Sequence, residues 1–175
     1  MPSARSFLAL ALCATALQGC SSDSTTAPDP EVTFTTLSPA VLSAYCVQGQ
    51  KLPGQAISGT LATTDCDSDW LGLPAGRTYR VVWHVRVATT GTYQFAATSI
   101  YDNVIIVDHL DSYTATTATL TEIGSDDDSG SDANALLSVP LTAGQDYFVK
   151  VIGWADDVVP PDVQIGPYTM TFTGP

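Results

Sequence analysis

The sequence predicts an all-β domain, an antiparallel β-sandwich of jelly-roll type with about nine strands. Residues 78–87 alternate between apolar side chains and side chains that are polar except for Val82, as in a strand with one buried face. Short segments of this kind recur along the chain and are separated by Gly- and Asp-containing turns. Residues 40–45, after Ser38-Pro39, are the only candidate for a turn of helix.

The expected strands follow one another at short intervals from residue 32 to the last residues of the chain. The turn signals Thr90-Gly91 and Thr142-Ala143-Gly144 predict two hairpins. In order, the predicted strands cover residues 32–36, 56–62, 78–87, 93–97, 103–108, 117–122, 134–141, 145–152 and 168–172.

The strand at 78–87 also predicts which side chains face the core. The expected inward set is Tyr79, Val81, Trp83, Val85 and Val87. The alternate positions, His84 among them, are expected to meet water.

The N-terminal 19 residues have the pattern of a secretory signal peptide. Arg5 precedes an uncharged apolar run from Phe7 to Leu17, which is too short to span a bilayer as a helix. Gly19-Cys20 then resembles a lipoprotein cleavage site, which predicts removal of residues 1–19 and a lipid on Cys20. The alternative is an ordinary secreted protein, cut after Ala14-Thr15-Ala16.

Residues 20–30 are expected to form the lipidated cysteine and a flexible tether, because the segment SSDSTTAPDP is polar and contains two prolines. Residues 31–175 then form one domain of common size. Ser21 after the cysteine favours the outer membrane, by resemblance to the sorting rule of enteric bacteria. We therefore expect export through the secretory pathway and a lipid-anchored position in the cell envelope.

The charge balance is strongly acidic. The chain has 6 Lys and Arg against 18 Asp and Glu, and loss of Arg5 with the signal leaves a net charge of −13. Such a surface repels phosphate backbones, so nucleic acid is not expected as a partner. An acidic surface attracts cations, and the alternative is that the charge simply keeps the protein soluble.

Cysteine usage predicts one disulfide. Cys13 leaves with the signal peptide and Cys20 takes the lipid, so Cys46 and Cys66 remain in an oxidising compartment. Their pairing closes a loop of about twenty residues and adds roughly 3 kcal/mol to stability in the chain-entropy model. No CxxC pair supports a metal site.

Several segments together resemble the bacterial pre-peptidase C-terminal (PPC) domain over roughly residues 40–174. In the family's order they are ISGTL at 57–61 with Asp65-Cys66, residues 79–87, GTYQF at 91–95, YDN at 101–103, SDDDSG at 125–130, LTAG at 141–144, YFVKV at 147–151 and GPYT at 166–169. The resemblance implies a small jelly-roll-like sandwich. Members commonly accompany secreted peptidases, and some relatives bind collagen, polysaccharide or calcium; this sequence has no peptidase part.

An acidic run is the strongest candidate for a metal site. Calcium takes six to eight oxygen ligands, and carboxylates on a bending loop supply them. The run does not have EF-hand spacing, and a solvated turn between two strands is the alternative. The predicted calcium ligands are Asp102, Asp126, Asp127, Asp128 and Asp132.

Aromatic residues in predicted loops are candidates for stacking on sugars. We expect this role for Trp70, Tyr101 and Trp154; the last is followed by Ala155 and two aspartates, a combination found in carbohydrate sites.

The sequence does not predict an enzyme. It has two histidines, of which His109 lies between Asp108 and Asp111, and it has neither a G-x-S-x-G nor an H-E-x-x-H motif. The expected function is a lipid-anchored, extracytoplasmic, non-catalytic module that binds a polysaccharide or an envelope or extracellular protein, with calcium as a candidate cofactor. The alternative is a structural envelope lipoprotein that assembles with partner proteins.

Overall fold

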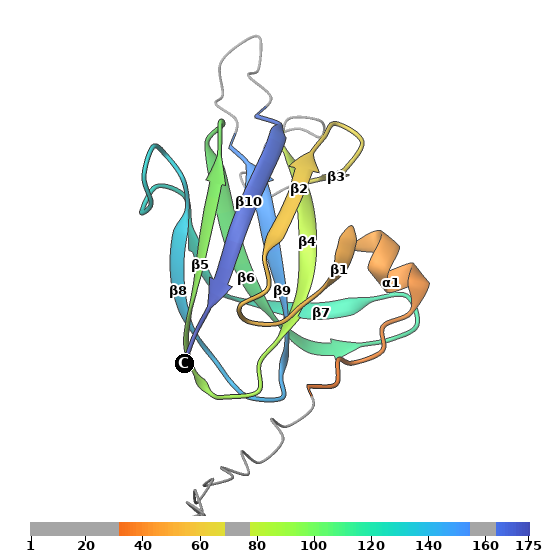
Figure 1. Ribbon diagram of the computed structural model, residues 1–175. Coiled ribbons are helices and arrows are strands. Elements are labelled where there is room, and N and C mark those ends of the chain that lie inside the picture. The colour runs from red at the N-terminus through yellow and green to blue at the C-terminus, as the bar shows by residue number, and fades with distance from the viewer. Residues whose placement is uncertain (1–31, 69–77, 155–163) are drawn as a thin grey trace, which may run out of the picture.

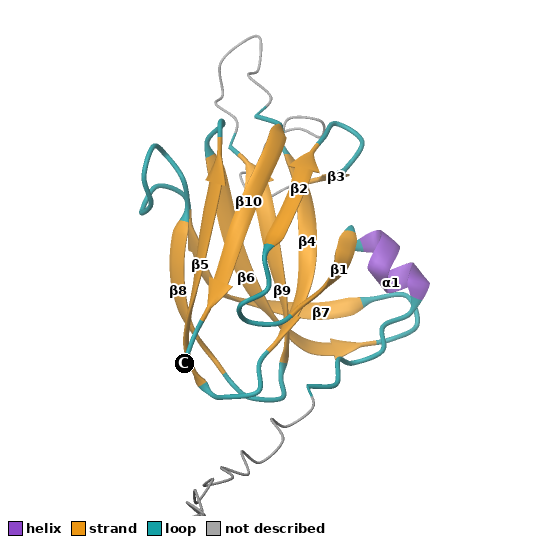
Figure 2. Ribbon diagram, viewed as in Figure 1, coloured by secondary structure: helices purple, strands orange, loops and turns teal. Residues whose placement is uncertain are grey.

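The computed structural model describes residues 32–68, 78–154 and 164–175. Two β-sheets pack face to face, and the one short helix of the described residues lies at the side (Figures 1 and 2). In the described residues no helix is long and apolar enough to cross a membrane. The elements are α1 (Pro39–Ala44), β1 (Val47–Lys51), β2 (Ile57–Leu61), β3 (Cys66–Asp67), β4 (Tyr79–Arg86), β5 (Gly91–Ser99), β6 (Asn103–Tyr113), β7 (Ala118–Asp126), β8 (Leu136–Leu141), β9 (Asp146–Gly153) and β10 (Gly166–Thr173).

The predicted sandwich is confirmed. One sheet has the strand order β2-β10-β5-β8, and we call it the four-stranded sheet. The other has the order β1-β4-β9-β6-β7, with β3 also paired to β4, and we call it the six-stranded sheet. In Figure 1 the four-stranded sheet is the front layer, with β10 at its centre.

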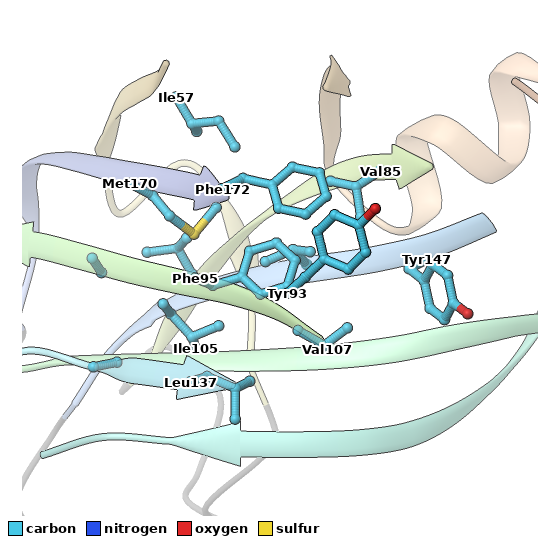
Figure 3. Packing of buried hydrophobic residues seen from close by; sticks show 14 of the residues in the cluster. Ile57, Val85, Tyr93, Phe95, Ile105, Val107, Leu137, Tyr147, Met170 and Phe172 are labelled. Atoms are coloured by element: carbon cyan, nitrogen blue, oxygen red, sulfur yellow. The ribbon is translucent and has the colours of Figure 1, made fainter. Parts of the chain in front are cut away.

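The core lies between the two sheets. Phe95 and Phe172, neighbours on β5 and β10, stack with ring centroids 4.6 Å apart. Val85 and Val107 reach the same layer from the six-stranded sheet, as Figure 3 shows. Alternation along each strand produces this layer, since every second side chain of β5 and β10 is buried.

Three strands were predicted wrongly or missed, and neither predicted hairpin forms, because β4 and β5, and likewise β8 and β9, lie in different sheets. Residues 32–36 lie in no strand, while β1 and β3 were not predicted. The pairing of β1 with β4 is parallel, so the sandwich is not wholly antiparallel. Both missed strands are short and pair along the same edge of β4, with β3 opposite Tyr79 and Arg80 and β1 opposite residues 82–85.

The predicted disulfide is present and ties these two edge strands together. Cys66 is in β3, and Cys46 directly precedes β1; their Cα atoms are 5.9 Å apart. The Cys46 carbonyl also accepts a hydrogen bond from the backbone N–H of Val82, at 3.1 Å. The edge of β4 is therefore covered by two short strands held by one covalent link.

The prediction for the outer face of β4 was wrong. Val82 and His84 are buried, because the segment from residue 34 to the end of α1 covers this face. Leu37 and Val41 pack there against Val82 and Phe148. Ser38 caps α1, and its hydroxyl accepts the Val41 N–H at 3.2 Å.

Candidate functional site

A pocket of about 450 Å³ opens at the end of the sandwich where β8 ends and β9 begins. We call it the end pocket. Its size is in the usual range for small-ligand sites. It is lined by His109 and Asp111 of β6, Thr121 and Ile123 of β7, Pro140 of β8, Thr142 and Gln145 of the β8–β9 turn, and Tyr147 of β9.

Two irregularities in the β6–β7 pairing shape this pocket. Val107 pairs with Gly124 and Asp108 with Glu122, which leaves Ile123 opposite no residue of β6. Leu110 pairs with Leu120 and Ser112 with Thr119, which leaves Asp111 without a partner residue. Bulges of this kind re-aim side chains. Both unpaired residues line the end pocket.

The polar side chains of the pocket are linked by hydrogen bonds. His109 Nδ1 lies 2.7 Å from Asp111 Oδ1, and His109 Nε2 lies 3.2 Å from Gln145 Oε1. The Thr121 hydroxyl donates to Asp111 Oδ2 at 2.7 Å. The hydrogen bonds from Thr121 and His109 hold the pKa of Asp111 below its ordinary value. The chain therefore presents oriented donors and acceptors at the pocket.

The β8–β9 turn positions Gln145 and the apolar floor. Gly144 has a φ of +76°, a conformation that glycine adopts without steric cost. Tyr147 is buried, and its hydroxyl accepts the backbone N–H of Thr142 at 2.9 Å. The Tyr147 ring lies 5.4 Å from the His109 ring, between centroids. One wall is thus polar, while Tyr147, Ile123 and Pro140 supply apolar surface.

A second hollow, of about 560 Å³, shares Asp111 and Gln145 with the end pocket. Arg86 and Asp146 are among the residues that line it. Asp146 accepts hydrogen bonds from His84 Nε2 at 2.7 Å and from Arg86 Nη1 at 2.5 Å. The hydroxyl of Thr35 also donates to it.

The residues predicted to bind calcium are not gathered into a ligand group. Among the described residues, no three His, Cys, Asp or Glu side chains are placed to hold a metal ion. Asp126 closes its own loop, since its Oδ2 accepts the N–H groups of Ser129 at 3.1 Å and Leu136 at 2.7 Å. Asp102 precedes β6, while Asp127, Asp128 and Asp132 lie in the loop before β8. Calcium binding itself stays a prediction.

Two of the three predicted sugar-stacking aromatics, Tyr101 and Trp154, lie among the described residues. Tyr101 is 6% exposed and belongs to the core, so its ring is not offered to a ligand, and burial raises its hydroxyl pKa. Trp154 is half-buried against Val104, Ile106 and Ile152. Trp70 and the lipidation site Cys20 lie outside the described residues.

Known proteins offer a similar fold and little similarity of sequence. No family model matches the chain, and no curated protein matches it. The chain is similar to the pre-peptidase C-terminal domain of a collagenase from Bacillus anthracis. That structure is 12% identical, with a TM-score of 0.45, over 71% of this chain and 93% of the other. The collagenase domain is a member of the family that the sequence segments of this chain resemble.

Two further solved structures are similar at 9% identity. One is a periplasmic inhibitor of g-type lysozyme from Aeromonas hydrophila, with a TM-score of 0.41 over 73% of this chain and 99% of the other. The second is a surface-associated copper-binding protein from Methylomicrobium album, with a TM-score of 0.46 over 74% of this chain and 99% of the other. None of these similarities assigns a ligand to this chain.

The sequence pointed to His109 and Asp111 only as neighbours at a strand end. Gln145 and Thr121 were missed, because nothing in the sequence marks the two bulges in the β6–β7 pairing or the pairing of β9 with β6 that brings the β8–β9 turn beside His109. The glycine before Gln145 marked the turn but not the direction of the Gln145 side chain.

Proposed function

We propose that this chain is a lipid-anchored, extracytoplasmic binding module without catalytic activity, and that its ligand enters the end pocket. The observation that carries the proposal is the convergence of His109, Asp111, Thr121 and Gln145 on one open pocket with apolar surface beside them. Sites with a few oriented polar groups on an apolar wall suit ligands that are partly polar and partly apolar. A saccharide unit of a polysaccharide fits this description best.

The position outside the cytoplasm is supported by the chain's own chemistry. The Cys46–Cys66 disulfide is of the kind that persists in oxidising compartments. The signal-like segment and Gly19-Cys20 supply the expected route and anchor in the envelope.

The non-catalytic reading is supported by the contacts of His109. Asp111 occupies one ring nitrogen and Gln145 occupies the other, so the hydrogen bonds of this ring activate no serine, threonine or cysteine. The His84 ring contacts Asp146 and lies between Phe34 and Phe148 with no exposed surface.

The test is titration calorimetry with soluble oligosaccharides, using the chain with Cys20→Ser so that it purifies without lipid. Gln145→Ala should weaken binding about fivefold, since one hydrogen bond to a ligand contributes roughly 1 kcal/mol. Gln50→Ala, at an exposed position of β1, is the matched control and should bind as the parent does. Equal affinities of both variants would contradict a ligand in the end pocket.

An envelope protein as ligand is the other outcome of this experiment. Crosslinking in cells to one membrane protein, together with no saccharide binding, would instead favour the structural lipoprotein that assembles with partners.

A further inference from the structure

The outer face of the four-stranded sheet differs from the rest of this acidic molecule in having no charge. None of β2, β5, β8 and β10 contains an Asp, Glu, Lys, Arg or His residue. Every strand of the six-stranded sheet contains at least one such residue. The whole chain carries 18 acidic residues, so a charge-free sheet is a marked exception.

The outward side chains of this sheet are mostly hydroxyls. We call them the neutral face, and its central members are Ser58, Gln94, Thr98, Ser138, Thr169 and Thr171. All six are exposed. In the described part of the chain none of these side chains makes a hydrogen bond to another residue, so their polar groups are open to solvent or to a ligand.

The strand register arranges these groups in rows. Thr169 of β10 lies opposite Ser58 of β2 on one side and opposite Thr98 of β5 on the other. Gln94 likewise lies opposite Ser138 of β8. Neighbours within a row are about 4.8 Å apart and successive outward residues of a strand about 6.7 Å apart, which gives a regular two-dimensional array of hydrogen-bonding groups.

A hollow of about 290 Å³ lies on this face between β5 and β10. Thr98 and Thr169 contribute hydroxyls to it, while Ile100 and Pro167 contribute apolar surface. Ile100 is 89% exposed, which makes it the most exposed large hydrophobic side chain of the described residues. Hydroxyls beside an apolar patch match the two sides of a sugar ring, whose C–H groups and hydroxyls face different directions.

We propose that the neutral face binds a neutral polysaccharide, with one sugar ring in the hollow against Ile100 and its hydroxyls on Thr98 and Thr169. The charge of the protein surface indicates which class of polymer this face can bind. The acidic surface around the face repels anionic polymers, and the face has no group that pairs with a charged ligand. The hollow shares no lining residue with the end pocket, and the inference rests on the proposed function and extends it to the polymer itself.

The test is co-sedimentation of the Cys20→Ser chain with three insoluble neutral polymers, amorphous cellulose, chitin and a β-1,3-glucan, and with polygalacturonate gel as the anionic comparison. We expect binding to at least one neutral polymer and none to the anionic gel. Thr169→Glu should reduce the bound fraction at least fivefold. Thr116→Glu, which adds the same charge on the exposed β6–β7 turn, should leave it unchanged.

A second variant covers the case in which Thr169→Glu fails to fold, which its thermal melt would reveal. Ile100→Ser changes a solvent-exposed residue after β5 and should still lower binding at least threefold. Absence of binding to every neutral polymer, or equal binding by Ile100→Ser and the parent, overturns the inference. If a neutral polymer binds while soluble oligosaccharides do not, the proposal of a saccharide in the end pocket is contradicted and the proposal for the neutral face is supported.

Discussion

Asp146 is the residue on which the N-terminal segment, β4 and β9 converge. It is buried, and it accepts hydrogen bonds from His84, Arg86 and Thr35. Burial raises its pKa, but the hydrogen bonds from His84 and Thr35 and the charges of His84 and Arg86 outweigh burial, so the net pKa is lowered. The ionised form therefore stabilises the fold.

We expect Asp146→Asn to lower the free energy of unfolding by about 3 kcal/mol near neutral pH, because Arg86 loses its buried partner. Since the pKa of Asp146 is lower in the folded chain, its contribution is fully present above the ordinary aspartate pKa and disappears as the pH falls through the lowered value. Urea unfolding from about pH 6 down to about pH 2 should show the two proteins converging at acid pH. A difference independent of pH would contradict this role.

His84 shows what residue-level patterns could not supply. Strand alternation correctly placed Val81 and Val85 in the core, and it placed His84 on the opposite face. The error was to equate that face with water, because burial there depends on Phe34 and Leu37, which are distant in sequence. The same limit applies to Tyr101, whose place in a predicted loop suggested exposure although it is buried.

At the scale of elements, α1 and the preceding segment act as the cover of the six-stranded sheet. Val41 has no exposed surface and packs with Leu37 and Phe148. We expect Val41→Ala to cost about 2 kcal/mol and to lower the melting temperature by roughly 5 °C. Ser43→Ala, on the exposed side of the same helix, is the matched control, and equal melting of both variants would show that the cover contributes little.

The disulfide belongs to this scale as well, because it joins β3 to the start of β1. Replacing Cys46 and Cys66 together by alanine should lower stability by about 3 kcal/mol, the value for a closed loop of this length. Hydrogen exchange should accelerate in β1 and β3 and remain slow in β5 and β10 at the centre of the other sheet. Uniform acceleration in all strands would mean that the link acts on the whole fold.

Elements with their own periodicity could be predicted, and those that depend on another element could not. Strands β5 and β10 alternate strongly between buried and exposed side chains, β4 and β9 are rich in apolar residues, and all four were found from the sequence. β1 and β3 exist because β4 offers them an edge. The end pocket depends on two bulges in β6–β7, and bulges left no mark in the residue pattern.

At the scale of the whole molecule, one measurement tests whether this acidic chain binds calcium at the candidate loop. The described carboxylates form no group of three around a common point, so calcium at this loop would need backbone carbonyls and waters among its ligands, and a melt of the chelator-treated protein with and without calcium tests for it. A ligand at one hundred times its dissociation constant would add about 2.7 kcal/mol. A rise of several degrees that is lost in Asp127→Ala would place a metal at the loop after all.

The contact between Thr35 and Asp146 also affects how the domain responds to a pulling force. A pull on the chain from the side of residue 31 reaches the sandwich first at Phe34 and Thr35, which bear on His84 and Asp146. A force large enough to break this contact then acts on the packing of Leu37 and Val41. Beyond them the chain is held by the Cys46–Cys66 disulfide. The cover is therefore the first part of the domain to carry tension from this side, and the disulfide passes any remaining force to β3, which pairs with β4.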